Sequence, residues 1–166
     1  MSATSHAAWF DASALVKRYI DERGSGPLRE YWAIQALRYT TPFCLYEALS
    51  ILKGCKRDGD LTKRQYLKAA TNLVNWFRAS ESMTQDIEFL RRDVFADAKR
   101  LAEHHDLDLS DAFQLLTLQA AGFSQFVGGR ASLLVTADKA LSRAARAMKL
   151  SVWDCMRDPA PAPFRP

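Results

Sequence analysis

The sequence has few of the features that build disulfide scaffolds or membrane anchors. Its 166 residues include only three cysteines, widely spaced and without a CxxC pair, which argues against a disulfide framework or zinc knuckle and fits a reducing cytoplasm. No apolar run approaches the ~20 residues that a membrane span needs. The amino terminus lacks a basic segment followed by a long apolar one, so no signal peptide is expected. We therefore expect a cytoplasmic protein with no membrane partner.

The charge balance is mildly basic, with a formal net charge of +4. Such a balance permits a nucleic-acid partner without requiring one. The cations are unevenly spread, because the segment 139–149 (KALSRAARAMK) carries four of them and no acid. Two interpretations stay open for this segment, a solvated helix face or a surface that contacts phosphates.

Short apolar segments alternate with helical patterns along the chain. This alternation predicts βαβ units, and hence an α/β fold with a mostly parallel sheet and helices on both faces. We assign residues 7–155 to one such domain and the proline-rich residues 156–166 to a disordered tail. The predicted strands cover 7–10, 38–41, 125–127, 132–136 and 150–154, and the predicted helices 12–20, 28–37, 42–55, 61–79, 85–104, 111–122 and 138–148.

Three acids occur where a strand or a loop delivers the start of a helix. Asp11 directly follows the first apolar strand, Asp138 follows the strand at 132–136, and Asp111 begins the most hydrophobic helix. Taken singly, each has an ordinary structural explanation, Asp11 as a helix N-cap and the other two as first-turn acids. Functional groups of parallel sheets collect beyond the carboxyl ends of the strands, so we expect the three acids to share one edge.

Glu47 is the only charged residue between Arg38 and Lys53, and it projects from a largely apolar helical face. An ionised carboxylate there costs several kcal/mol unless a cation or hydrogen-bond donors compensate it. A more exposed helix or a buried ion pair would also explain it. Together with the three other acids, Glu47 suggests an oxygen-rich site suited to Mg²⁺ or Mn²⁺, of the kind that supports phosphoryl chemistry.

Other catalytic arrangements are less well supported. His104 and His105 are adjacent on a helix end and point about 100° apart, so both cannot easily serve one metal ion. Ser13 lacks the GxSxG elbow of a serine hydrolase. A phosphatase with an aspartyl nucleophile would place Asp11 in a DxD motif, but the sequence there is Asp-Ala-Ser.

Four blocks in this order, DASALVKRY, TPFCLYEALSIL, LDLSDAFQLLTL and LLVTADKALSRAA, cover most of the chain from residue 10 to about residue 153. In this pattern the sequence resembles the PIN-domain ribonucleases, in particular the VapC toxins of bacterial VapBC toxin–antitoxin pairs. The resemblance implies an α/β/α sandwich with a short, mostly parallel central sheet. It also implies that the acidic metal-site residues are Asp11, Glu47, Asp111 and Asp138, with the hydroxyls of Ser13 and Thr136 beside them.

The resemblance further implies a Mg²⁺-dependent endoribonuclease that cleaves RNA, often structured RNA such as tRNA, through metal-activated water. It implies inhibition by a cognate VapB-like antitoxin and a homodimer. The alternative is a catalytically silent PIN-like module that binds RNA or a protein. The helices between residues 61 and 104 are long for a compact VapC, which leaves the subgroup and its RNA open.

A carboxylate cluster repels RNA, so cations are needed around it. On the helix after Asp138, the side chains of Lys139, Arg143 and Arg146 fall on one broad face. We hypothesise that Lys17 or Arg18, together with this face, contacts the phosphate backbone. The same face also suits an acidic antitoxin segment.

Overall fold

The sheet at the centre of the computed structural model is entirely parallel, and its four strands follow the order β2-β1-β3-β4. The structure describes residues 6–35, 37–79, 91–120 and 131–162. Along the central pair, Trp9 is opposite Leu134 and Phe10 is opposite Val135. At the outer edge, Thr136 is opposite Asp154. The strands are β1 (His6–Phe10), β2 (Arg38–Tyr39), β3 (Ala131–Thr136) and β4 (Ser151–Asp154).

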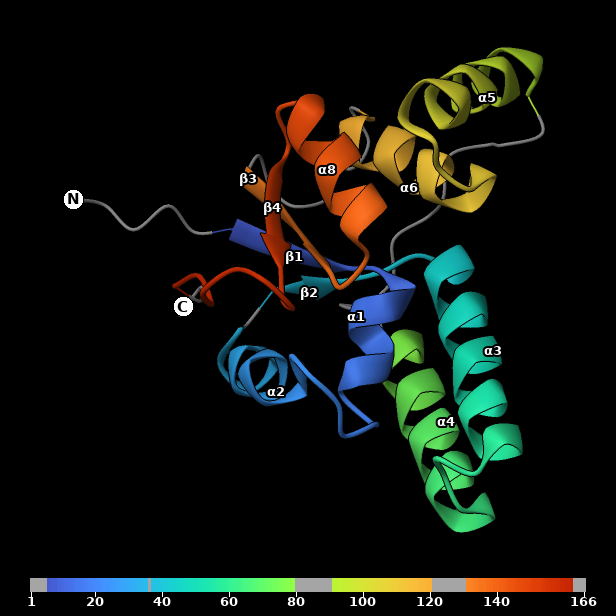
Figure 1. The fold of residues 1–166 in the computed structure, drawn as a ribbon, viewed down its shortest axis with the longest axis vertical. Helices are drawn as coiled ribbons and strands as arrows, with labels where there is room; N and C mark the ends of the chain where they lie inside the picture. Colours follow the sequence, from blue (N-terminus) through green and yellow to red (C-terminus); the bar gives the residue numbers. More distant parts are fainter. Residues whose placement is uncertain (1–5, 36, 80–90, 121–130, 163–166) are drawn as a thin grey trace.

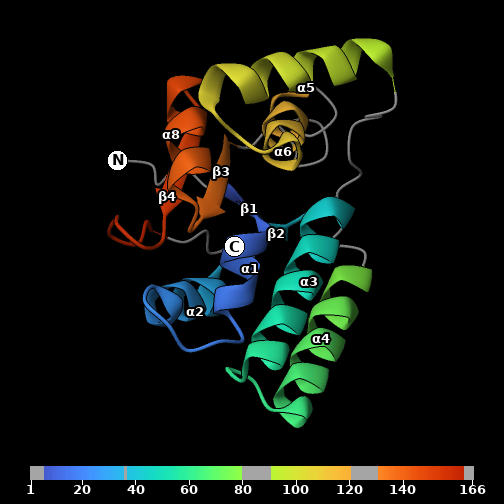
Figure 2. The same ribbon diagram turned by 45° about the vertical axis from the view of Figure 1, so that its right-hand side comes forward.

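Helices cover both faces of this sheet, so the predicted α/β/α sandwich is confirmed (Figure 1). One layer holds α1 (Ala12–Lys17), α2 (Ser25–Ile34), α3 (Pro42–Asp58) and α4 (Lys63–Arg78). The other holds α6 (Leu109–Gln119) and α8 (Lys139–Ala147), with α5 (Arg92–His105) lying across the outside of α6 (Figure 2). The strand predicted at 125–127 lies outside the described residues.

Two hydrophobic cores result from the two-residue alternation of the strands. Ala8 and Phe10 of β1 face the layer of α1 to α4 and pack with Leu15, Leu28 and other apolar side chains. The intervening Ala7 and Trp9 face α6 and α8. Burial on both faces explains why these strands are continuous apolar runs rather than alternating ones.

Several helix boundaries differ from the sequence prediction, among them the end of α1 at Lys17, and two of the differences have a clear physical reason. The helix predicted from residue 28 begins at Ser25, because Pro27 fits the first turn, where its missing N–H has no helical partner in any case. Gly24 precedes it with a φ of 85°, and a Cβ there would approach the carbonyl oxygen of Cys155 to 2.8 Å. The helix predicted to end at Cys55 continues to Asp58, and Gly59 ends it with a φ of 95°.

The chain remains hydrogen-bonded to the domain beyond β4. The carboxylate of Asp154 accepts from the backbone N–H of Met156 at 3.0 Å and from the Arg157 guanidinium at 2.6 Å. Asp158 in turn accepts from the backbone N–H of Asp154 at 2.9 Å. The first residues of the segment assigned to a disordered tail therefore form a turn held by these acids. All three cysteines are free thiols, and no helix in the described ranges has the length and apolar character to cross a bilayer.

Candidate active site

Asp11 is a buried acid at the carboxyl end of β1, with only 3% of its surface exposed. It is the N-cap of α1, as its side chain accepts from the backbone N–H of Ala14 at 2.8 Å. Its two carboxylate oxygens also accept from the Ser13 hydroxyl, each at 2.9 Å. The capping role that the sequence suggested is therefore real, and it holds the carboxylate in one orientation.

Two hydroxyls connect Asp11 to the turn that begins α8. The Thr136 hydroxyl donates to Asp11 Oδ2 at 2.7 Å, across 125 residues of sequence, and accepts from the backbone N–H of Asp138 at 2.9 Å. The Ser13 hydroxyl accepts from the backbone N–H of Ala137 at 2.8 Å. These contacts fix the carboxyl end of β1, where α1 begins at Asp11, against the carboxyl end of β3, where α8 begins at Asp138.

Asp138 and Asp111 complete this edge of the sheet. Asp138 is the N-cap of α8, where Oδ1 accepts from the backbone N–H of Leu141 at 2.8 Å, whereas the sequence suggested a first-turn position. Asp111 lies in the first turn of α6, as expected, and is partly buried. Its only hydrogen bond among the described side chains is a long one, 3.4 Å from the Gln114 amide.

Glu47 projects from the second turn of α3 and is half-buried rather than enclosed. Burial raises the pKa of its carboxyl, and the negative charges of Asp108 and Asp138 raise it further. Asp108 is an acid that the sequence analysis did not select. It occupies the N-cap position of α6 without a side-chain cap hydrogen bond. Its position three residues before Asp111 could have identified it from the sequence, because this spacing places both acids on one face at the start of the helix.

Burial and the charges of neighbouring acids raise the pKa of two of these carboxyls, Asp11 and Asp111. Burial raises the pKa of Asp11 from 3.8 to about 6, against the opposing effect of its hydrogen bonds to Thr136, Ala14 and Ser13. Burial raises the pKa of Asp111 to about 7, and there the charges of Asp11, Asp138, Glu47 and Asp108 all add to the effect. The shared site of the four acids stays a prediction, and the effect of the other three charges on the pKa of Asp111 is consistent with it.

The family model of the PIN domain matches residues 8–147 of the chain. The chain belongs to the PIN-domain family. The crystal structure of PAE2754 from Pyrobaculum aerophilum has a similar fold, with a TM-score of 0.56 at 16% identity over 91% of this chain and 87% of that chain. No curated protein matches the sequence. PIN domains are a family of metal-dependent nucleases, whose members typically use divalent metals.

The donor chemistry of this PIN domain fits a divalent cation. Asp11, Glu47, Asp111 and Asp138 supply hard oxygen ligands, and a cation among them would offset the repulsion that raises the pKa of Asp111. Within the ranges that the structure describes, no three or more His, Cys, Asp or Glu side chains already form a metal-holding group. The fit therefore depends on the kind of ligand atom and its charge, and not on a preformed coordination shell.

The cations expected to contact RNA have different surroundings. Lys17 is 3% exposed, and its ammonium donates to Glu22 at 2.7 Å and to the carbonyl of Arg23 at 2.9 Å. This burial contradicts a phosphate-contacting role for Lys17. The guanidinium of Arg18 lies instead over the ring of Trp32, at 4.5 Å from its centroid.

The basic face of α8 is only partly open. The guanidinium of Arg146 forms an ion pair with Asp158, which the sequence analysis had placed in a free tail. Arg143 is exposed and donates to the carbonyl of His105 over 3.4 Å, a weak contact. Lys139 is exposed next to Asp138. Of the three, Lys139 and Arg143 are the better placed to meet a phosphate.

Replacing Lys17 with Met is expected to destabilise the protein by about 1–2 kcal/mol, because two charge-assisted hydrogen bonds are lost while half-exposed Glu22 regains water. RNA affinity should not change. Urea denaturation and RNA binding measure the two effects. The exposed Lys139→Met variant is the control and should keep its stability within about 0.5 kcal/mol. Unchanged stability together with weaker RNA binding in Lys17→Met would restore the original hypothesis.

Proposed function

We propose that this PIN domain is a Mg²⁺-dependent endoribonuclease, for which Mn²⁺ can substitute. The observation that carries the proposal is the pair of hydrogen bonds by which Thr136 joins Asp11 to the Asp138 turn at the carboxyl edge of the sheet. Burial and then the charges of the other acids raise the pKa of Asp111 beside them. Acids that repel one another at the end of a buried sheet need a cation to be ionised together. Oxygen-only donors favour Mg²⁺ and Mn²⁺ over softer metals.

Each residue has a defined part in this proposal. Asp11, Glu47, Asp111 and Asp138 hold the metal and are the catalytic residues, and the bound metal supplies an activated water and charge stabilisation for phosphodiester hydrolysis. The hydroxyls of Ser13 and Thr136 orient Asp11 and saturate part of its lone pairs, which directs its remaining acceptor capacity toward the other acids. The backbone contacts of these hydroxyls keep the Asp138 turn in register with α1.

The biological role that we propose is that of the toxin in a type II toxin–antitoxin pair, acting in the cytoplasm on RNA, including tRNA. The four sequence blocks that resemble VapC toxins support this role. With this role we expect a cognate VapB-like antitoxin as the partner and a homodimer as the oligomeric state. Incubation of total RNA with the protein, with Mg²⁺ or with chelator, tests the activity. Cleavage that persists in chelator contradicts the metal mechanism, and no cleavage with Mg²⁺, or with Mn²⁺ in its place, favours a silent RNA- or protein-binding module.

Lys139 and Arg143 are proposed to hold the RNA backbone beside the acids. Neutralising both, as Lys139→Gln with Arg143→Gln, should lower the slope of log affinity against log salt by about two and weaken binding about tenfold or more. The matched control is Lys63→Gln with Arg64→Gln, two exposed cations in the first turn of α4. RNA binding at several salt concentrations measures the slope. A slope equal to that of the unmodified protein would remove α8 from the RNA-binding surface.

A further inference from the structure

A second site with the chemistry of an anion receptor lies where α1, α2, β2 and α4 meet. It is a cavity of about 490 Å³, lined by Arg18, Arg29, Trp32, Ala33, Arg38 and Trp76. Three of these six residues are arginines and two are tryptophans, and none of them is an acid. Among the residues that the structure describes, this lining offers guanidinium groups beside indole rings and no carboxylate, which suits a ligand that is both anionic and flat.

Trp32 organises this cavity. Its ring is almost fully buried, and the guanidinium carbons of Arg18 and Arg38 lie 4.5 Å and 5.2 Å from its centroid. The ring of half-buried Trp76 meets it edge-on at 4.7 Å. A guanidinium that stacks through its face can keep its in-plane N–H groups for an anion, because the five donors point along the plane. Arg38 uses one of them on the carbonyl of Trp32 at 2.7 Å, so Arg18 is the better anion donor of the two.

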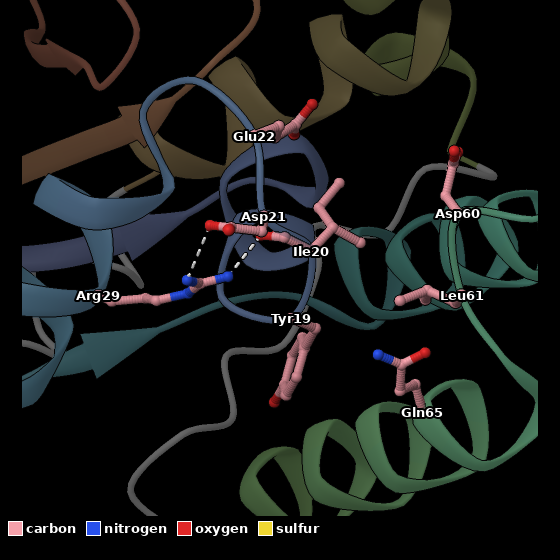
Figure 3. Close-up of a pocket in the computed structure, with 8 residues that line it drawn as sticks. All are labelled: Tyr19, Ile20, Asp21, Glu22, Arg29, Asp60, Leu61 and Gln65. Carbon is pink, nitrogen blue, oxygen red and sulfur yellow. Dashed lines mark hydrogen bonds and ion pairs between the residues drawn. The ribbon is translucent and has the colours of Figure 1, made fainter.

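A neighbouring cavity shows the contrast. That cavity, of about 400 Å³, also includes Arg29, but Asp21, Glu22 and Asp60 line it too (Figure 3). The Arg29 guanidinium pairs with Asp21 at 3.3 Å and donates to the carbonyls of Arg18 and Ile20, so its charge is offset and its donors are used. Within the part of the chain that the structure describes, Arg18 forms no ion pair, so it is the cation that faces the first cavity with its charge unbalanced.

We propose that this Arg–Trp cavity binds a nucleotide of the RNA strand at a distance from the cleavage site. Arg18 contacts the phosphate, Arg38 adds positive charge, and Trp76 offers a surface on which a base stacks. The inference rests on the proposed ribonuclease function. Arg18 caps the carboxyl end of the helix whose amino end is capped by Asp11, about 10 Å away along its axis. The acids of the candidate site repel RNA. A cationic contact outside the acidic cluster would offset this repulsion by attracting the same strand.

The test measures RNA binding separately from cleavage. The protein carries Asp111→Asn to suppress hydrolysis, and binding of a labelled single-stranded RNA of about 12 nucleotides is followed by anisotropy over a range of salt. Arg18→Gln should weaken binding about five- to tenfold and lower the salt slope by about one. Arg64→Gln, an exposed arginine of α4 outside the cavity, is the matched control and should keep the slope. Because this readout needs no catalysis, it stands even where cleavage is absent.

A second variant covers the case in which Arg18→Gln fails to fold. Arg18→Lys keeps the charge and the stem over Trp32, so it should retain the salt slope. It should bind RNA more weakly than the unmodified protein, because lysine lacks the planar guanidinium fork. The proposal is overturned if Arg18→Gln and Arg64→Gln bind RNA alike, even when the protein cleaves RNA. It is also overturned if Arg18→Gln leaves RNA binding intact but abolishes binding of a hexaglutamate peptide, which would make the cavity a docking site for an acidic protein segment.

Discussion

Replacing Asp111 with Asn is expected to lower the rate of metal-dependent RNA cleavage by more than about 100-fold, because even residues that only support a metal ligand contribute 10- to 100-fold. The fold should tolerate the change. Asp111 makes one long hydrogen bond, and its pKa is raised to about 7 by burial and then by the charges of neighbouring acids. Asn keeps the shape and removes the charge, so the metal-free protein should melt at the same or a higher temperature.

The matched control is Asp93→Asn. Asp93 is also a first-turn acid, but it lies on α5, is exposed and pairs with Arg91. Its replacement should leave cleavage unchanged. Initial rates on one RNA substrate, with thermal melts of each variant in chelator, complete the test. Full cleavage by Asp111→Asn would reject the metal site, and lost cleavage with a clearly lower melting temperature would assign Asp111 a structural role instead.

The metal-free protein is expected to be more stable near pH 5 than near pH 8. Burial is the main cause that raises the pKa of Asp11 from 3.8 to about 6 and that of Asp111 to about 7. Between about pH 4 and pH 7 the folded chain therefore binds more protons than the unfolded chain, and stability falls as pH rises through this window. For Asp11 alone, a pKa raised from 3.8 to about 6 corresponds to at most about 3 kcal/mol of stability.

Urea denaturation in chelator at pH 5, 6, 7 and 8 measures this dependence. Asp11→Asn should flatten it, whereas Asp93→Asn should not, since Arg91 lowers the pKa of Asp93 through a hydrogen bond. Adding Mg²⁺ or Mn²⁺ at pH 8 should restore stability, because a cation favours the ionised acids. Stability that rises from pH 5 to pH 8 without metal would show that the acids are compensated by another group.

Local pattern accounts for what the sequence predicted well. Strand and helix periods depend on near neighbours in the chain, so the βαβ alternation and the positions of Asp11 and Asp138 at strand ends were readable in advance. The edge rule for parallel sheets then predicted that these acids share one side. The start of α2 and the end of α3 were predicted wrongly. Both depend on backbone conformation, since Pro27 is tolerated in the first turn of α2 and Gly59 ends α3 with a positive φ.

The sequence by itself determined the fold class and the PIN family, and the four acids of the candidate site stay its prediction. Only the tertiary structure decided which side chains are free to act. Lys17 and Arg146 look equivalent to other cations in sequence, but packing buries the first against Glu22 and places the second on Asp158. The hydroxyl of Thr136 reaches Asp11 across 125 residues, and Arg18 meets Trp32 only after α1 and α2 have packed. Contacts between distant segments depend on that packing, which no local period encodes.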